Sequence, residues 1–177
     1  MQRYNIALLL DDNNLNKKII DISRRYFLDI QDKYILGADG LPHVTLCQFK
    51  AANVDGAVKV YDAFKAGGVE DVVDLTIEKF NLRPGTLVNS GKFIAEYKVK
   101  HSPDLVDLQL KCANTLDQFG FKSLTSVKMY NPHITLSRIS VVPKEEPSSE
   151  DLLCPVDVTA HLSLGLSTDE GVFIEEL

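Results

Sequence analysis

The chain has 177 residues, with a formal net charge of −6 and a pI near 5.2. This length suits one domain with a substantial core and is short for two, so we expect a single domain over residues 1–177. With 45% hydrophobic and 25% charged residues, the composition is that of a globular protein, and its acidic balance excludes the broad basic surface that grips long nucleic acid. A small anionic substrate, or one end of an RNA, stays compatible with a local basic pocket.

In chain order, the first half combines strand-like apolar runs with segments of helical spacing. It predicts a strand over 3–10, a helix over 14–32 capped by Asn13 or Asn14, a strand over 43–49 and a helix over 54–66 stopped by Gly67-Gly68. The second half predicts strands over 72–82 and 92–99, a helix over 103–119 capped by Ser102, and strands over 133–142 and 156–166 separated by a polar loop. This order indicates an α+β protein with antiparallel sheet and helices packed outside.

The cysteines and the N-terminus bear on the compartment. Cys47, Cys112 and Cys154 form no C-x-x-C pair, which favours reduced thiols in a cytosolic protein. The first apolar run, residues 6–10, is too short for a signal sequence or a membrane span. We therefore expect a cytoplasmic protein that does not enter a membrane.

Two segments of the chain repeat each other, and each stands at the start of a predicted strand. They are Pro42-His43-Val44-Thr45-Leu46 and Pro132-His133-Ile134-Thr135-Leu136. In a strand, residues i and i+2 point to the same face. Each His therefore shares a face with its Thr, while the apolar residues between them face the helices. Together with the strand and helix ahead of each copy, the repeat indicates an internal duplication with one catalytic strand per half.

Two imidazoles and two hydroxyls suit phosphodiester chemistry. An imidazole has a pKa near 6.5, so at neutral pH one His can accept a proton while the other donates one. Thr hydroxyls can donate hydrogen bonds to the non-bridging phosphate oxygens. Proton transfer and fixed hydrogen-bond donors would neutralise the charge that develops on the phosphate. No third ligand at metal-binding spacing accompanies the two His, so we expect neither metal nor cofactor.

The second segment, from Tyr130 to Arg138, resembles the second motif of bacterial 2′-5′ RNA ligases and cyclic phosphodiesterases, and the segment from His43 to Phe49 is similar to their first motif. These belong to the 2H phosphoesterase superfamily, named for two H-x-[ST]-hydrophobic motifs. The resemblance implies a bilobal, duplicated fold in which two antiparallel sheets form a central groove with helices outside. It implies hydrolysis of 2′,3′-cyclic phosphates of RNA or nucleotides to 2′-phosphates, or cleavage and joining of 2′-5′ bonds.

Carried over by residue, the resemblance makes His43 and His133 the acid/base pair and Thr45 and Thr135 the phosphate binders. For opening of a cyclic phosphate, we assign His133 as the base and His43 as the acid, and the sequence leaves the exchange of these roles open. Arg138 occupies a position that is often basic in this branch. A regular strand would point Arg138 away from the cleft, and a bulge could return it.

Residues around the motifs carry weaker expectations. Tyr130 is a candidate for stacking on a base, with core packing as the alternative. Cys47 shares the parity of His43 and Thr45, which would bring it near the site, although a packed thiol is its more ordinary role. We expect substrate selectivity to come from three loops, over residues 37–41, 83–92 and 122–131.

Two other functions stay open. The chain could be a non-catalytic module that binds RNA ends or nucleotides on the same scaffold, or a metal-dependent hydrolase. The enzyme hypothesis takes precedence because a pure binder has no need of two proton-transfer groups. We expect the chain to act as a monomer, with RNA ends or a small nucleotide as its partner.

Overall fold

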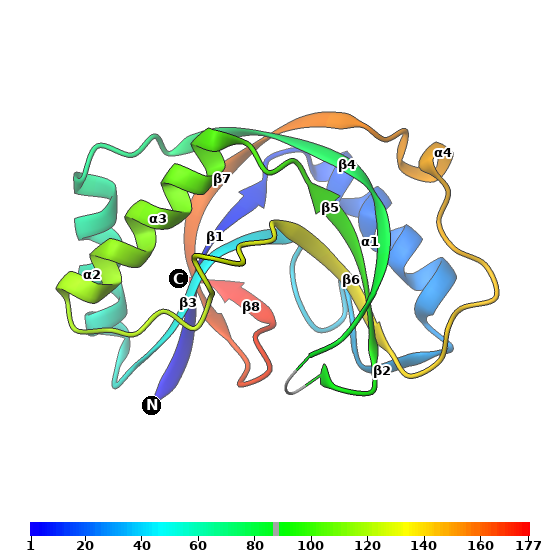
Figure 1. Ribbon diagram of the computed structural model, residues 1–177, viewed down its shortest axis with the longest axis horizontal. Coiled ribbons are helices and arrows are strands. Elements are labelled where there is room, and N and C mark those ends of the chain that lie inside the picture. Colours follow the sequence, from blue (N-terminus) through cyan, green and yellow to red (C-terminus); the bar gives the residue numbers. More distant parts are fainter. Residues whose placement is uncertain (87–88) are drawn as a thin grey trace.

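The computed structural model describes residues 1–86 and 89–177 and contains strands and helices in an α+β arrangement (Figure 1). The strands are β1 (Gln2–Leu10), β2 (Gln31–Ile35), β3 (His43–Ala51), β4 (Val72–Pro84), β5 (Phe93–Val99), β6 (His133–Ile139), β7 (Val156–Ser167) and β8 (Phe173–Glu176). The helices are α1 (Asn13–Phe27), α2 (Val54–Ala66), α3 (Pro103–Gln118) and α4 (Ser149–Leu152).

The described strands form one antiparallel sheet in the order β2-β6-β5-β4-β7-β1-β3, with β8 added beside β7. Strands β4 and β7 are the longest, and each changes partner along its length. The first part of β4 pairs with β7 and the second part with β5, while β7 pairs with β4, then β1, then β8. Backbone hydrogen bonding is therefore continuous across the protein, in place of the two separate sheets that the sequence led us to expect.

The helices flank the curved sheet in two pairs. Helices α2 and α3 lie at one end of the sheet, and α1 and α4 lie at the other (Figure 1). Each buries one stripe, for example Ala57, Val60 and Phe64 of α2, while its other side faces solvent. Burial of each large apolar side chain contributes roughly 1.5–3 kcal/mol. All four helices contribute residues to one continuous hydrophobic core, among them Ile19, Ala57, Leu105 and Leu152.

The predicted element boundaries differ from the structure in the first helix. Helix α1 ends at Phe27, its cap is Asp12 rather than Asn13 or Asn14, and β2 begins at Gln31, before the predicted end of the helix at residue 32. Asp12 accepts hydrogen bonds from the backbone N–H groups of Asn14 and Leu15, as a helix cap does. Apolar residues continue at helical spacing past Phe27, so their spacing could not mark the boundary.

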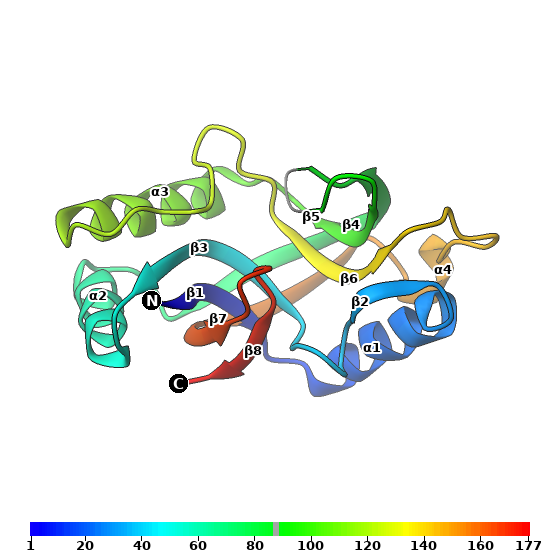
Figure 2. The same cartoon turned by 90° about the horizontal axis from the view of Figure 1, so that it is seen from below.

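Strands β3 and β6 carry the two repeated motifs, and they lie in contact although each is hydrogen-bonded to a different neighbour, β1 and β5 (Figure 2). Both strands contain a bulge at the same place in the motif. Cys47 and Thr45 pair with consecutive residues of β1, so Leu46 is the extra residue in β3. Leu136 is the extra residue in β6 in the same way. A bulge shifts the alternation of every residue that follows it.

Candidate active site

A cavity of about 750 Å³ lies on the concave side of the sheet, where β3 meets β6. All six residues singled out from the sequence line it, namely His43, Thr45, Tyr130, His133, Thr135 and Arg138. Two motifs that are far apart in the chain therefore contribute to one space. This juxtaposition is the geometric condition that a two-histidine site requires.

The two histidines are held in the same manner. Each is the first residue of its strand, and each ring Nδ1 lies within hydrogen-bonding distance of the carbonyl oxygen two residues earlier. The distance is 2.7 Å from His43 Nδ1 to Leu41 O and 2.6 Å from His133 Nδ1 to Asn131 O. A carbonyl can only accept a hydrogen bond, so Nδ1 carries the proton in both rings. In a neutral ring the unprotonated nitrogen is then Nε2.

The surroundings of His43 are apolar. Leu9 and Ala7 of β1 pair with His43 and Thr45, and together with Phe173 of β8 they form a small buried cluster. The rings of Phe173 and His43 lie 5.2 Å apart between centroids. The pKa of His43 is lowered to about 4, chiefly by burial; the positive charge that His133 can carry adds to this shift, and the hydrogen bond to the Leu41 carbonyl opposes it. His43 is therefore neutral in the free protein at pH 7.

The surroundings of His133 are charged. Lys98 and Glu96 of β5 occupy the positions beside His133 and Thr135 that Leu9 and Ala7 occupy in the other half. The Glu96 carboxylate is fully buried, 3.7 Å from His133 Nε2. Arg83 Nε donates to Glu96 at 2.8 Å and Asn81 Nδ2 at 2.9 Å. A protonated His133 would thus have an ion-pair partner, which His43 lacks among these neighbours.

The threonines are held by polar groups of the sheet. Asn5 Nδ2 donates to Thr45 Oγ1 at 3.0 Å, so the Thr45 hydroxyl keeps its own hydrogen for a group in the cavity. Tyr130 Oη donates to the Thr45 carbonyl at 3.0 Å, and the Tyr130 residue is only 8% exposed. Tyr130 thus braces the first motif from the second half of the chain, and most of its ring is packed.

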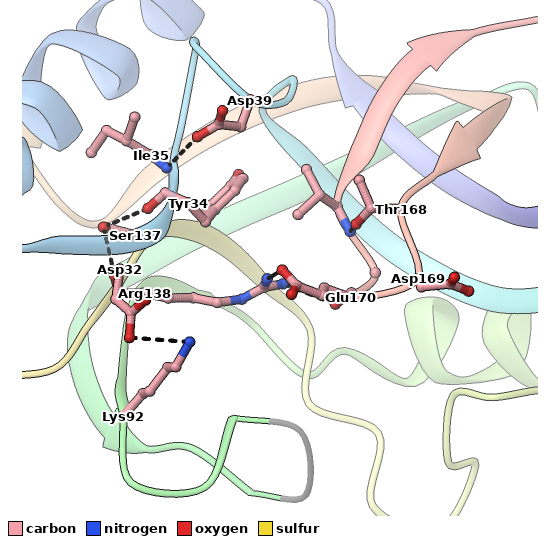
Figure 3. Close-up of polar contacts among 12 residues, drawn as sticks. Asp32, Tyr34, Ile35, Asp39, Lys92, Ser137, Arg138, Thr168, Asp169 and Glu170 are labelled. Carbon is pink, nitrogen blue, oxygen red and sulfur yellow. Dashed lines mark hydrogen bonds and ion pairs between the residues drawn. The ribbon is translucent and has the colours of Figure 1, made fainter.

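Arg138 reaches the cavity because of the bulge at Leu136. Without that bulge, regular alternation along β6 would point the Arg138 side chain away from the cavity. It is 7% exposed, and its guanidinium lies 5.2 Å from the centre of the Tyr34 ring. Its terminal nitrogens contact the Glu170 carboxylate at 3.3 Å and the Glu170 carbonyl at 2.9 Å (Figure 3). Burial lowers the pKa of Arg138, and the Glu170 charge opposes that shift.

The bulge at Leu46 has the same effect in the first motif. It brings Gln48, the counterpart of Arg138, into the cavity wall. Gln48 Nε2 donates to the Gly171 carbonyl at 2.8 Å, so both counterparts hold the turn between β7 and β8. The same bulge turns Cys47 into the core, beside Gln109. The regular alternation that would have brought Cys47 near the site is therefore interrupted at Leu46, and Cys47 is a packed thiol.

Two of the three loops expected to set selectivity contribute to the cavity. Loop 83–92 contributes Arg83, Thr86 and Asn89, although residues 87 and 88 lie outside the described residues. Loop 122–131 contributes Leu124, Thr125, Ser126, Met129, Tyr130 and Asn131, whereas none of the described lining comes from residues 37–41. The turn between β7 and β8 contributes Glu170, Gly171 and Val172, and no sequence signal pointed to it.

Neither a metal cluster nor a membrane span is found in the described parts of the chain. Residues 1–86 and 89–177 contain no group of three or more His, Cys, Asp or Glu side chains arranged to hold a metal ion. Over the same residues, every helix is too short or too polar to cross a bilayer.

Comparison by sequence finds no matching family model and no matching curated protein. Comparison of folds finds Escherichia coli LigT, solved with 3′-AMP, at a TM-score of 0.66 and 16% identity over 94% of this chain and 88% of that one. It also finds a phosphoesterase at a TM-score of 0.67 and 17% identity over 99% and 97% of the two chains. Kluyveromyces marxianus Usb1, solved with uridine monophosphate, matches at 0.52 and 10% identity over 95% and 96%. These neighbours belong to the 2H phosphoesterase superfamily, and at such identities the likeness establishes the fold.

Proposed function

Taking the fold of the 2H phosphoesterases as the starting point, we propose that this chain is a metal-independent phosphoesterase that acts through His43 and His133. Its substrates are 2′,3′-cyclic phosphate ends of RNA or nucleotides, which it opens to 2′-phosphates, and 2′-5′ phosphodiester bonds, which it cleaves or joins. The observation that carries the proposal is that both H-x-T motifs line one cavity, with both rings held through Nδ1.

The contrast between the two histidines supports a division of labour. Neutral His43 takes the proton from water as the water oxygen bonds to phosphorus. The bond from phosphorus to the 3′ oxygen breaks, and His133, beside Glu96, gives a proton to that oxygen. The product keeps the phosphate on the 2′ oxygen. These roles are exchanged relative to the assignment from the sequence, because burial lowers the pKa of His43. In the joining direction the roles reverse.

The remaining site residues bind the phosphate. The Thr45 and Thr135 hydroxyls donate to its non-bridging oxygens, where charge accumulates. Arg138 supplies positive charge from the same face of β6. Tyr130 fixes the first motif from outside the phosphate site, and with 8% exposure it leaves little ring surface for stacking on a base.

The compartment and oligomeric state form part of the proposal. The three cysteines are free thiols, which supports a reducing compartment such as the cytoplasm.

The six predicted residues come from one chain, which supports activity as a monomer of two pseudo-symmetric halves. The matching bulges at Leu46 and Leu136 support duplication of the motif-bearing half.

The test is a panel of 2′,3′-cyclic mononucleotides with 2′-5′ and 3′-5′ dinucleotides, assayed with a chelator present. We expect turnover to a 2′-phosphate, and a loss of roughly 10²–10⁴-fold in kcat for His43→Ala and for His133→Ala. His101→Ala, at an exposed loop position beside Tyr130 that does not itself line the cavity, should keep full activity. Full activity in either cavity variant would refute the proposal, loss on chelation would indicate a metal enzyme, and binding without turnover would indicate a binding module.

A further inference from the structure

The charges that line the cavity nearly cancel. Among its described residues, the cations are Arg83, Lys98 and Arg138, and the carboxylates are Glu96 and Glu170. Glu96 pairs with Arg83 within the wall, and Glu170 pairs with Arg138 at the mouth. What remains is the single positive charge of Lys98, with both imidazoles counted as neutral.

The position that matches Arg138 in the other half of the site carries an uncharged side chain. This residue is Gln48, whose amide accepts from Arg3 and donates to the Gly171 carbonyl. The positive charge at these two matching positions therefore comes from Arg138 alone, and it is the charge that Glu170 offsets.

Glu170 is fixed in place by the turn that carries it. The Glu170 carbonyl accepts from Arg138 at 2.9 Å, and the next carbonyl accepts from Gln48 at 2.8 Å. On the other flank, Asp169 forms an ion pair with Lys50 at 2.9 Å. The Glu170 carboxylate is half exposed and lies against the Arg138 guanidinium (Figure 3), and Glu170 is among the residues that line the cavity.

We propose that Glu170 is a specificity-determining residue, whose carboxylate offsets Arg138 so that the cavity holds a singly charged phosphodiester in preference to a doubly charged phosphomonoester. A diester or cyclic phosphate carries one negative charge, whereas a monoester carries about −1.5 to −2 at pH 7. The second charge of a monoester would lie close to the fixed Glu170 carboxylate, which already pairs with Arg138.

This inference rests on the proposed function and deepens it. Opening a cyclic phosphate adds water and converts a monoanionic diester into a monoester that ionises further. Glu170 therefore disfavours the product relative to the substrate and assists its release. Removal of the carboxylate should strengthen inhibition by the 2′-phosphate product more than it lowers KM for the cyclic substrate.

The test compares Glu170→Gln with the natural protein by calorimetry at pH 8, using two small probes, inorganic phosphate as the dianion and dimethyl phosphate as the monoanionic diester. We expect Glu170→Gln to tighten phosphate binding roughly fivefold relative to dimethyl phosphate, a modest factor because solvent screens a half-exposed charge. The backbone contact from Arg138 to residue 170 needs no carboxylate, so the turn should keep its position.

Asp169→Asn is the matched control, since it removes one negative charge from the same turn at a side chain that is 82% exposed and does not line the cavity. An equal gain for both probes in Glu170→Gln, no gain, or the same shift in Asp169→Asn would overturn the inference. The probe ratio is measured without turnover. An inactive protein that shows the expected ratio would refute the proposed function alone, and an active protein that lacks it would refute the role of Glu170 alone.

Discussion

The ring of Phe173 packs against the ring of His43, with 5.2 Å between their centroids and 37° between their planes. Phe173 belongs to the last strand of the sheet, and it closes the apolar cluster formed by Ala7 and Leu9 beneath the histidine. No equivalent cluster lies beside His133 in the described residues, where Glu96 and Lys98 take the matching positions. The two halves of the site thus have the same strand pairing and differ in the polarity of the side chains beside each histidine.

Removal of the Phe173 ring should raise the pKa of His43 from about 4 toward 6.5, because desolvation is the largest cause of its depression. In Phe173→Ala, the acidic limb of the kcat/KM profile should move to higher pH by one or more units, since that profile reports the free enzyme's base. An NMR titration of His43 gives the same value directly. Ile174→Ala, at an exposed neighbour on β8, should leave both measurements unchanged.

The buried His43 should also make folding stability depend on pH. Its pKa is lower in the folded protein than the unfolded value of 6.5, so the unfolded chain binds more protons between these values. The stability associated with neutral His43 is complete above pH 6.5 and is lost as the pH falls toward 4, by about 3 kcal/mol. Urea unfolding across this range should show a steeper loss in the natural protein than in His43→Gln. Identical pH dependence in the two proteins would contradict the expected burial.

The Arg83–Glu96 pair should show strong coupling. Arg83→Met leaves the fully buried Glu96 carboxylate without its cation and should cost about 3 kcal/mol. Glu96→Gln leaves an arginine whose side chain is 34% exposed and can reach water, so we expect a smaller cost of about 1 kcal/mol. The double variant should be more stable than the sum of the two losses by at least about 1 kcal/mol. Strict additivity in urea unfolding would show that the pair contributes no interaction energy.

Gly171 should tolerate a side chain poorly for two separable reasons. Its φ of +89° disfavours any L residue, and a Cβ there would lie 2.9 Å from Gln48 Oε1. Gly68 has a similar φ of +78° and nothing within 4 Å of an added Cβ, so Gly68→Ala measures the backbone cost alone. We expect thermal unfolding to give a loss for Gly171→Ala larger by about 1 kcal/mol, because the Gln48 hydrogen bonds must shift. Equal losses would show that Gln48 moves aside without cost.

The sequence was most informative where a local pattern decides the structure. Helix α2 has the predicted bounds, and α3 begins after its Ser102 cap with Pro103 in the first turn. The α+β class and the meeting of the two motifs also agree with the structure. For the helices the information lies in neighbouring residues, such as a cap or a stop, whereas the meeting of the motifs was expected from their repetition and from the family resemblance.

Features set by tertiary contacts were not predictable in the same way. Glu96, Asn5 and Phe173 border the site through strand pairing between distant segments, which one sequence does not specify. Strand β8 has only four residues, and it is recognisable only beside β7. Gln48 could have been predicted, because alignment of the two motifs in the sequence matches it with Arg138.

The way β4 and β7 run through both halves has a mechanical consequence. A protein built of two bodies joined by a hinge could open and close its groove by bending at the joint. Here such bending would break the backbone ladder that connects the halves, so the gap between the two imidazoles is set by covalent geometry and strand pairing. Adjustment to ligands of different size must then come from the loops that line the cavity, 83–92 and 122–131, and from the turn between β7 and β8. We expect insertions in these loops to change which molecules bind, while the distance between the His43 and His133 rings stays the same.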